Sequence, residues 1–149
     1  MTTFFVPGVP APQGSKSFKG MRGGKPVLVE SSKKVGPWRQ VVAQVAALKL
    51  REPLDGPITL DLEFVMPRTK AMGKKPAPPM VQAPDIDKLV RSTCDALSGV
   101  AYGDDSQVVK LSALKRRAEH GEQTGAHITV NHYEHPTPSG VVKVRTETP

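Results

Sequence analysis

Stretches of strand-like and helix-like hydrophobic periodicity alternate along this chain, and their order limits the folds that it can adopt. Residues 58–66, ITLDLEFVM, alternate apolar and polar side chains, which predicts a half-buried strand. Residues 38–48 and 86–97 instead repeat apolar side chains at helical spacing, so each predicts a helix. We therefore expect an α/β (α+β) fold, with one mixed β-sheet and two helices packed on it. Further extended segments are predicted at residues 2–6, 25–30, 106–119 and 125–134.

The chain of 149 residues is long enough for one domain and too short for two ordinary ones. We assign residues 1–133 to this domain and residues 134–149 to a flexible C-terminal tail, although its VVKVR stretch also fits an edge strand. Residues 68–84 are rich in Pro, Lys and Gly and predict a disordered or ligand-ordered loop. HGEQTG, residues 120–125, predicts a hairpin loop between the last two strands.

The formal net charge of +7 indicates an anionic partner, and nucleic acid fits best because the basic residues occur in clusters. No apolar run approaches the ~20 residues of a membrane span, and no secretory signal precedes Pro7. Together with the single cysteine, Cys94, this predicts a cytoplasmic protein with no membrane partner. The KRR run at residues 115–117 is one basic cluster. The candidate DNA-binding residues in the others are Lys16, Lys19, Arg22, Arg68, Lys70, Lys74 and Lys75.

Five aspartates lie between residues 83 and 109 of this basic chain, and two structural roles could account for some of them. Asp85 follows Pro84 at the predicted helix start, where its carboxylate would cap the helix by accepting a backbone N–H of Asp87 or Lys88. Asp87, Arg91 and Asp95 follow one another at helical spacing, as in a solvated salt-bridge ladder. Neither role explains the pair Asp104 and Asp105.

Carboxylates without a nearby Cys or His ligand form a hard-oxygen site, which suits Mg²⁺ or Mn²⁺ rather than zinc. An acidic metal centre on a basic surface is typical of a metal-dependent nuclease. One geometric gap stays open, because Asp105 begins a strand that passes back along the helix. Its carboxylate could lie several helical turns from Asp85.

The stretches PDIDKLVRSTCDAL and GVAYGDDSQVVKL resemble the signature of the RusA family of Holliday-junction resolvases, and FFVPGVPAPQGSKSF resembles the opening of that family. The resemblance covers about residues 2–130 and is most specific between residues 84 and 111. It implies a small homodimeric Mg²⁺-dependent endonuclease that makes paired symmetric cuts in branched, four-way DNA. It also implies that dimerisation brings the sites together.

Carried onto this sequence, the resemblance implies that Asp85, Asp87 and Asp105 are the metal-binding and catalytic carboxylates. The family has a functional lysine where this chain has Arg91, which keeps the charge but does not readily transfer a proton. We assign Arg91 to phosphate or transition-state contact. The expected reaction is in-line attack of water on the scissile phosphate, which leaves 5′-phosphate and 3′-hydroxyl ends.

Two other functions stay open from the sequence. One is a non-catalytic DNA-binding protein whose aspartates cap a helix and balance the basic surface. The other is a nuclease for flaps or other branched DNA. The family often occurs in phages, so the resemblance also suggests a role in phage DNA recombination, repair or packaging.

Overall fold

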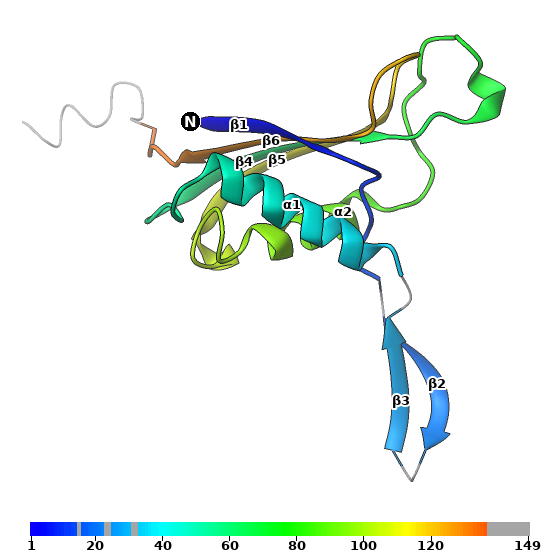
Figure 1. The fold of residues 1–149 in the computed structure, drawn as a ribbon, viewed down its shortest axis with the longest axis horizontal. Helices are drawn as coiled ribbons and strands as arrows, with labels where there is room; N and C mark the ends of the chain where they lie inside the picture. Colours follow the sequence, from blue (N-terminus) through cyan, green and yellow to red (C-terminus); the bar gives the residue numbers. More distant parts are fainter. Residues whose placement is uncertain (15, 23–24, 31–32, 137–149) are drawn as a thin grey trace, which may run out of the picture.

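The computed structural model describes residues 1–14, 16–22, 25–30 and 33–136, and between residues 16 and 30 it describes the backbone alone. A four-stranded mixed sheet carries two helices on one face, as predicted (Figure 1). No helix in the described part of the chain is long and apolar enough to cross a membrane. The elements are β1 (Thr2–Pro7), β2 (Lys16–Arg22), β3 (Lys25–Glu30), α1 (Val35–Lys49), β4 (Ile58–Met66), η1 (Lys70–Met72), α2 (Ile86–Leu97), η2 (Asp105–Gln107), β5 (Val108–Arg117) and β6 (Gly125–His132).

The four-stranded sheet has the order β1-β6-β4-β5, with β4 antiparallel to β6 and parallel to β5. The predicted hairpin between the last two strands is therefore wrong, because β4 lies between β5 and β6. The side chains of β4 explain its central place: Ile58, Leu60 and Phe64 are fully buried under the helices. The backbone N–H and C=O groups of so deeply buried a strand must be paired at both edges, and hydrophobic periodicity does not specify which strands pair with them.

The predicted strand at residues 25–30 is present, but it pairs with β2 in a separate two-stranded sheet. Figure 1 shows this hairpin extending away from the four-stranded sheet. The prediction that the loop at residues 68–84 is disordered is also corrected, because the loop has internal hydrogen bonds. In it, the guanidinium of Arg68 donates to the carbonyl oxygens of Met72, Gly73, Lys75 and, beyond the loop, Ala118. The tail beyond residue 136, with its VVKVR stretch, lies outside the described residues.

Helix α2 packs on the core through Leu89, Thr93 and Leu97, whereas Ile86 at its start is 38% exposed. Ser92 lies on the same packed face: it is fully buried and donates its hydroxyl to the carbonyl of Ala11 at 2.6 Å. Two further buried groups join the helices, as the indole N–H of Trp38 in α1 donates to the Thr93 hydroxyl at 3.1 Å. Buried polar groups that find partners in this way add little cost to the core.

Candidate active site

The first candidate carboxylates lie at the N-terminal end of α2. Asp85 is the N-cap residue, yet its side chain makes no capping hydrogen bond, so the capping alternative is wrong. Asp87 follows in the first turn, and both residues are exposed. Carboxylates at a helix N-terminus are stabilised by the helix dipole without needing a direct cap bond. Both therefore face solvent with oxygens available for a ligand.

Basic side chains of β5 fix the backbone that leads into α2. The ammonium group of Lys115 donates to the carbonyl oxygens of Gln82 and Pro84, at 2.7 and 2.8 Å. Arg117 donates to the carbonyl of Pro67 at 2.8 Å, on the other side of the same loop. Arg116 forms ion pairs with Glu63 and Glu122, at 2.6 and 2.7 Å. The KRR run, predicted as one of the DNA-facing clusters, thus holds the loop that positions Asp85.

The second group of carboxylates lies beyond the other end of α2, where the segment DDSQ forms η2. Asp104 caps this turn by accepting the backbone N–H of Ser106 at 2.9 Å. The Gln107 amide oxygen accepts the N–H groups of Gly103 and Asp104, while its NH₂ group donates to the carbonyls of Leu54 and Gly56. Asp104 and Gln107 therefore have structural roles, and Asp105 between them is left to face the end of α2.

Asp105 contacts Asp95 of α2 and the hydroxyl of the buried Tyr102. Partial desolvation raises the pKa of the Asp105 carboxyl above its ordinary value, and the negative charges of Asp95 and Asp104 add to the rise; the Tyr102 hydrogen bond opposes it. Burial also raises the pKa of the nearby Cys94 thiol to about 11, so this cysteine is a neutral packing residue at pH 7. Two carboxylates in mutual contact are a typical place for a cation to bind.

The two groups do not meet within one chain. At a rise of about 1.5 Å per residue, the helix puts about 12 Å between Asp87 and Asp95. Across residues 1–14 and 33–136, no three Asp, Glu, His or Cys side chains come together as a metal site would require. The geometric gap expected from the sequence is thus present, with Asp85 and Asp87 at one end of α2 and Asp105 beside Asp95 at the other.

Arg91 lies on the exposed side of α2, between these two ends. The ion pairs found among the described residues do not include Asp87, Arg91 or Asp95, so the salt-bridge ladder expected as an alternative is not formed. The exposed side chains of Asp87 and Arg91 remain available for contacts outside the chain, whereas Asp95 is half-buried beside Asp105.

The predicted DNA-binding residues are placed in different ways. Lys70, Lys74 and Lys75 are exposed on the loop before α2. Arg68 is only 14% exposed and holds that loop together, a structural role that the sequence does not indicate; a DNA contact by Arg68 stays a prediction. The remaining three lie on β2, and their side chains are outside the described residues: Lys16, Lys19 and Arg22.

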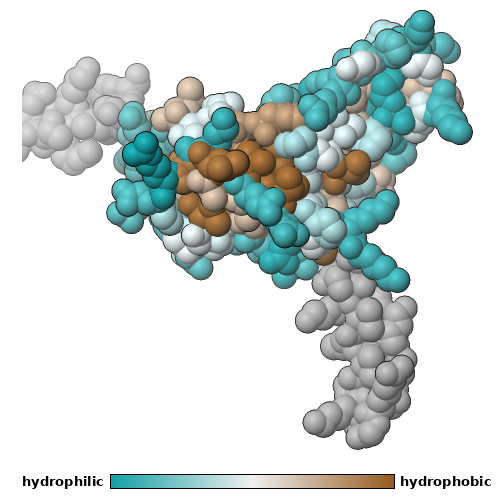
Figure 2. Space-filling model, in the orientation of Figure 1, coloured by the Kyte–Doolittle hydropathy of each residue, from teal (hydrophilic) through white to brown (hydrophobic). Residues whose placement is uncertain are grey.

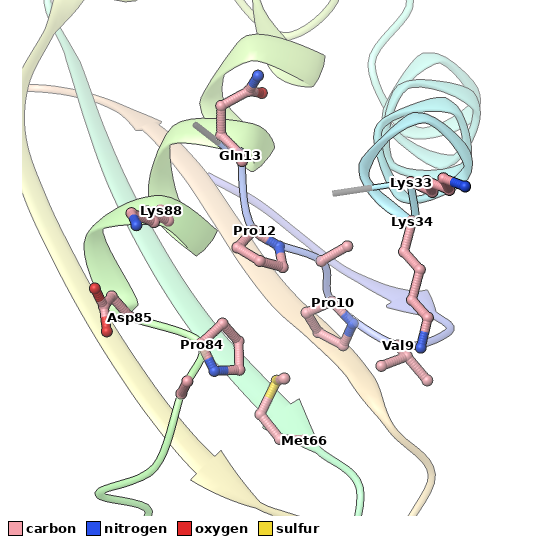
Figure 3. Close-up of a pocket in the computed structure, with 13 residues that line it drawn as sticks. Val9, Pro10, Pro12, Gln13, Lys33, Lys34, Met66, Pro84, Asp85 and Lys88 are labelled. Atoms are coloured by element: carbon pink, nitrogen blue, oxygen red, sulfur yellow. The ribbon is translucent and has the colours of Figure 1, made fainter. Parts of the chain in front are cut away.

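A cleft beside Asp85 is a feature that the sequence reading missed. It has a volume of about 670 Å³ and lies between the segment after β1, the start of α1 and the start of α2. Figure 3 shows Pro10 and Pro12 facing Pro84 and Met66, with Asp85 toward one side and Lys34 toward the other. The sequence offers one signal for this cleft, the proline-rich stretch PGVPAP that follows β1.

The raised pKa of Asp105 predicts an effect on stability. A carboxyl whose pKa is raised by folding favours the folded state when protonated, and this contribution is lost as the pH rises through its folded-state value. Without metal, Asp105→Asn should therefore have a higher unfolding temperature than wild type at pH 7, and the difference should vanish at acid pH. Thermal unfolding of both proteins across this pH range measures the effect.

Asp104→Asn is the matched control, because the Ser106 hydrogen bonds lower the pKa of Asp104. This variant should show no increase in unfolding temperature at pH 7. Equal midpoints for Asp105→Asn and wild type at pH 7 would show that the Asp105 carboxyl is not desolvated.

Comparison with known proteins identifies relatives over most of the chain. A family model described as endodeoxyribonuclease RusA matches residues 7–131. The chain is also similar to an uncharacterized protein, YqaN of Bacillus subtilis (strain 168), with 32% identity over 126 residues. That alignment covers 78% of this chain and 87% of the relative.

Proposed function

Since the chain belongs to the RusA family of endodeoxyribonucleases, we propose that it resolves four-way DNA junctions by paired symmetric cuts with Mg²⁺ as its cofactor. Membership of this family makes the protein a DNA endonuclease of the Holliday-junction resolvase class. The observation that carries the finer proposal is the division of the carboxylates into two groups at opposite ends of α2. A role in DNA recombination and a phage origin belong to the same proposal.

The division of the carboxylates is explained if the active site forms between two chains. A two-fold axis across the middle of α2 would set the Asp85 and Asp87 end of one helix against the Asp105 end of its partner. Each dimer would then hold two equivalent sites, which is what a two-fold symmetric junction needs for paired cuts. Arg91, near the middle of the exposed side of α2, would lie close to both sites.

Helix α1, which packs beside α2, offers an apolar surface for such a partner. Figure 2 shows hydrophobic side chains gathered over the region of α1. Val41, Val45 and Leu48 share one stripe of this helix; the two valines are partly buried against the core, and Leu48 is 84% exposed. An exposed leucine that continues a stripe of partly buried valines is more readily explained by an interface than by solvent contact.

The donor set fits Mg²⁺, because carboxylate oxygens are the ligands that hard divalent cations prefer, with Mn²⁺ as a substitute. Asp85 and Asp87 of one chain with Asp105 of the other would hold the ion. Bound there, Mg²⁺ would supply an activated water and offset the negative charge that develops on the phosphate.

The cationic side chains have separate roles in this proposal. Arg91 would contact the phosphate at the point of cleavage, where a fixed positive charge stabilises the transition state. Lys70, Lys74 and Lys75, with Lys16, Lys19 and Arg22 of β2, would track the arms of the junction. Binding through such phosphate contacts weakens steeply as the salt concentration rises.

Cleavage of synthetic DNA tests the function directly. With Mg²⁺ or Mn²⁺, the protein should cut a four-way junction at symmetric positions and leave linear duplex intact, and EDTA should stop the reaction. A flap of the same sequence is the competing substrate. Binding without cleavage in either metal would reject the enzymatic proposal, and faster cleavage of the flap would identify a nuclease for other branched DNA.

A further inference from the structure

The cleft beside Asp85 combines apolar walls with cations at its rim. The walls come from Pro10 and Pro12 on one side and from Pro84 and Met66 on the other (Figure 3). The rim carries Lys33, Lys34 and Lys88, with Gln13 between the segments. Its volume of about 670 Å³ is within the usual range of small-molecule sites, roughly 300–1,000 Å³.

The walls of the cleft are held in place by hydrogen bonds to α2. The buried Ser92 hydroxyl donates to the carbonyl of Ala11, and the backbone N–H of Gln13 donates to the carbonyl of Lys88 at 3.0 Å. On the opposite wall, Lys115 donates to the carbonyl of Pro84. The cleft is therefore formed before any ligand enters, which lowers the entropic cost of binding.

The order of groups along the cleft matches one nucleotide of a DNA strand. Asp85 lies at one side, the flat faces of the prolines lie in the middle, and Lys34 lies at the other side. A site that bound only a phosphate anion would need the lysines but not the apolar walls, whereas a nucleobase is a flat group that can pack between such walls. A base costs least to extrude where pairing and stacking are already interrupted, and in a four-way junction that place is the point of strand exchange.

Resting on the function proposed above, we propose that this cleft binds an unpaired nucleobase next to the scissile phosphate. The base lies between the proline walls, and the next phosphate of the same strand contacts Lys34. The cleft thereby selects junction DNA over linear duplex, because a fully stacked duplex presents no base to it.

Val9 offers a way to block the cleft, because it lines the rim and is 49% exposed. Val9→Trp should slow cleavage of an intact junction at least about tenfold, which corresponds to about 1.4 kcal/mol. Val81→Trp is the matched control, since Val81 is 85% exposed and is not among the residues that line the cleft. The control should cut at the wild-type rate.

An abasic site, moved one nucleotide at a time past the cut, identifies the bound base. At one position the abasic junction should slow the wild-type protein by about the same factor, and Val9→Trp should lose no further activity there, because both changes remove one interaction. If the abasic site slows Val9→Trp by the same further factor as it slows the wild-type protein, the two losses are independent and the proposal is overturned. If the wild-type protein cuts no junction at all, the proposed function itself fails, which is a distinct result.

Lys34→Gln gives a second readout that does not depend on filling the cleft. It should reduce the slope of the logarithm of the binding constant against the logarithm of the salt concentration by about the amount that one phosphate contact contributes. Lys49→Gln, at the far end of α1, should reduce this slope less. Equal salt dependence for the two variants would remove the phosphate contact from the proposal.

Discussion

Replacing Asp85 or Asp105 with asparagine is expected to slow junction cleavage by roughly 10²–10³-fold, while junction binding changes by less than about twofold. Asparagine keeps the shape of the side chain but removes the charge that a hard divalent cation requires. Binding persists because it rests on lysine and arginine contacts with phosphates. Single-turnover cleavage in saturating Mg²⁺, with gel-shift binding in its absence, measures the two effects separately.

The adjacent carboxylate provides the control for this result. Asp104→Asn alters a side chain that accepts the backbone N–H of Ser106 within η2, so its cleavage rate should stay close to wild type. A loss as large as that of Asp105→Asn would mean that the turn, rather than one carboxylate, is what matters. Normal cleavage by Asp105→Asn would exclude this residue from the site.

An equimolar mixture of Asp85→Asn and Asp105→Asn chains is expected to recover about a quarter of the wild-type nicking activity. If the site forms between chains, a mixed dimer places both lesions in one site and leaves the other site with three intact carboxylates. Random exchange makes about half of the dimers mixed, and each has one working site of its two. The product should be a nicked junction rather than a resolved one, and denaturing and native gels distinguish the two.

Mixing Asp85→Asn with Asp87→Asn chains is the matched control. These lesions lie in the same half of the site, so every site in a mixed dimer is damaged and no activity should return. Recovery in neither mixture would show that each chain builds its own site, by a movement of the Asp105 segment toward Asp85.

Local structure was largely predictable from residue spacing. The periodicity at residues 38–48 and 86–97 predicted α1 and α2, and the alternation at 58–66 predicted β4. These signals are reliable because a helix or strand must bury one face, whatever it packs against. Strand order was not predictable in the same way. The segments β5 and β6 follow each other in the chain but are separated by β4, whose buried backbone groups are paired at both edges.

The partners of the charged residues were also not predictable from the sequence. Lys115, Arg116 and Arg117 have the composition of a DNA-binding run, yet each is engaged with backbone carbonyls or carboxylates of its own chain. A cation has the same appearance in a sequence whether it faces a phosphate or a carbonyl oxygen. Only the folded chain shows which group lies within hydrogen-bonding distance.

By itself, the sequence determined the helices, most strands, the basic charge and the set of aspartates that resembles a nuclease site. The tertiary structure decided that Asp85 does not cap its helix, that Asp104 caps a turn instead, and that Asp105 contacts Asp95. It also placed the two carboxylate groups at opposite ends of α2. The physical reason is that residue spacing along a helix fixes distances within that helix, whereas the position of Asp105 depends on how the turn after α2 packs against Leu54 and Gly56.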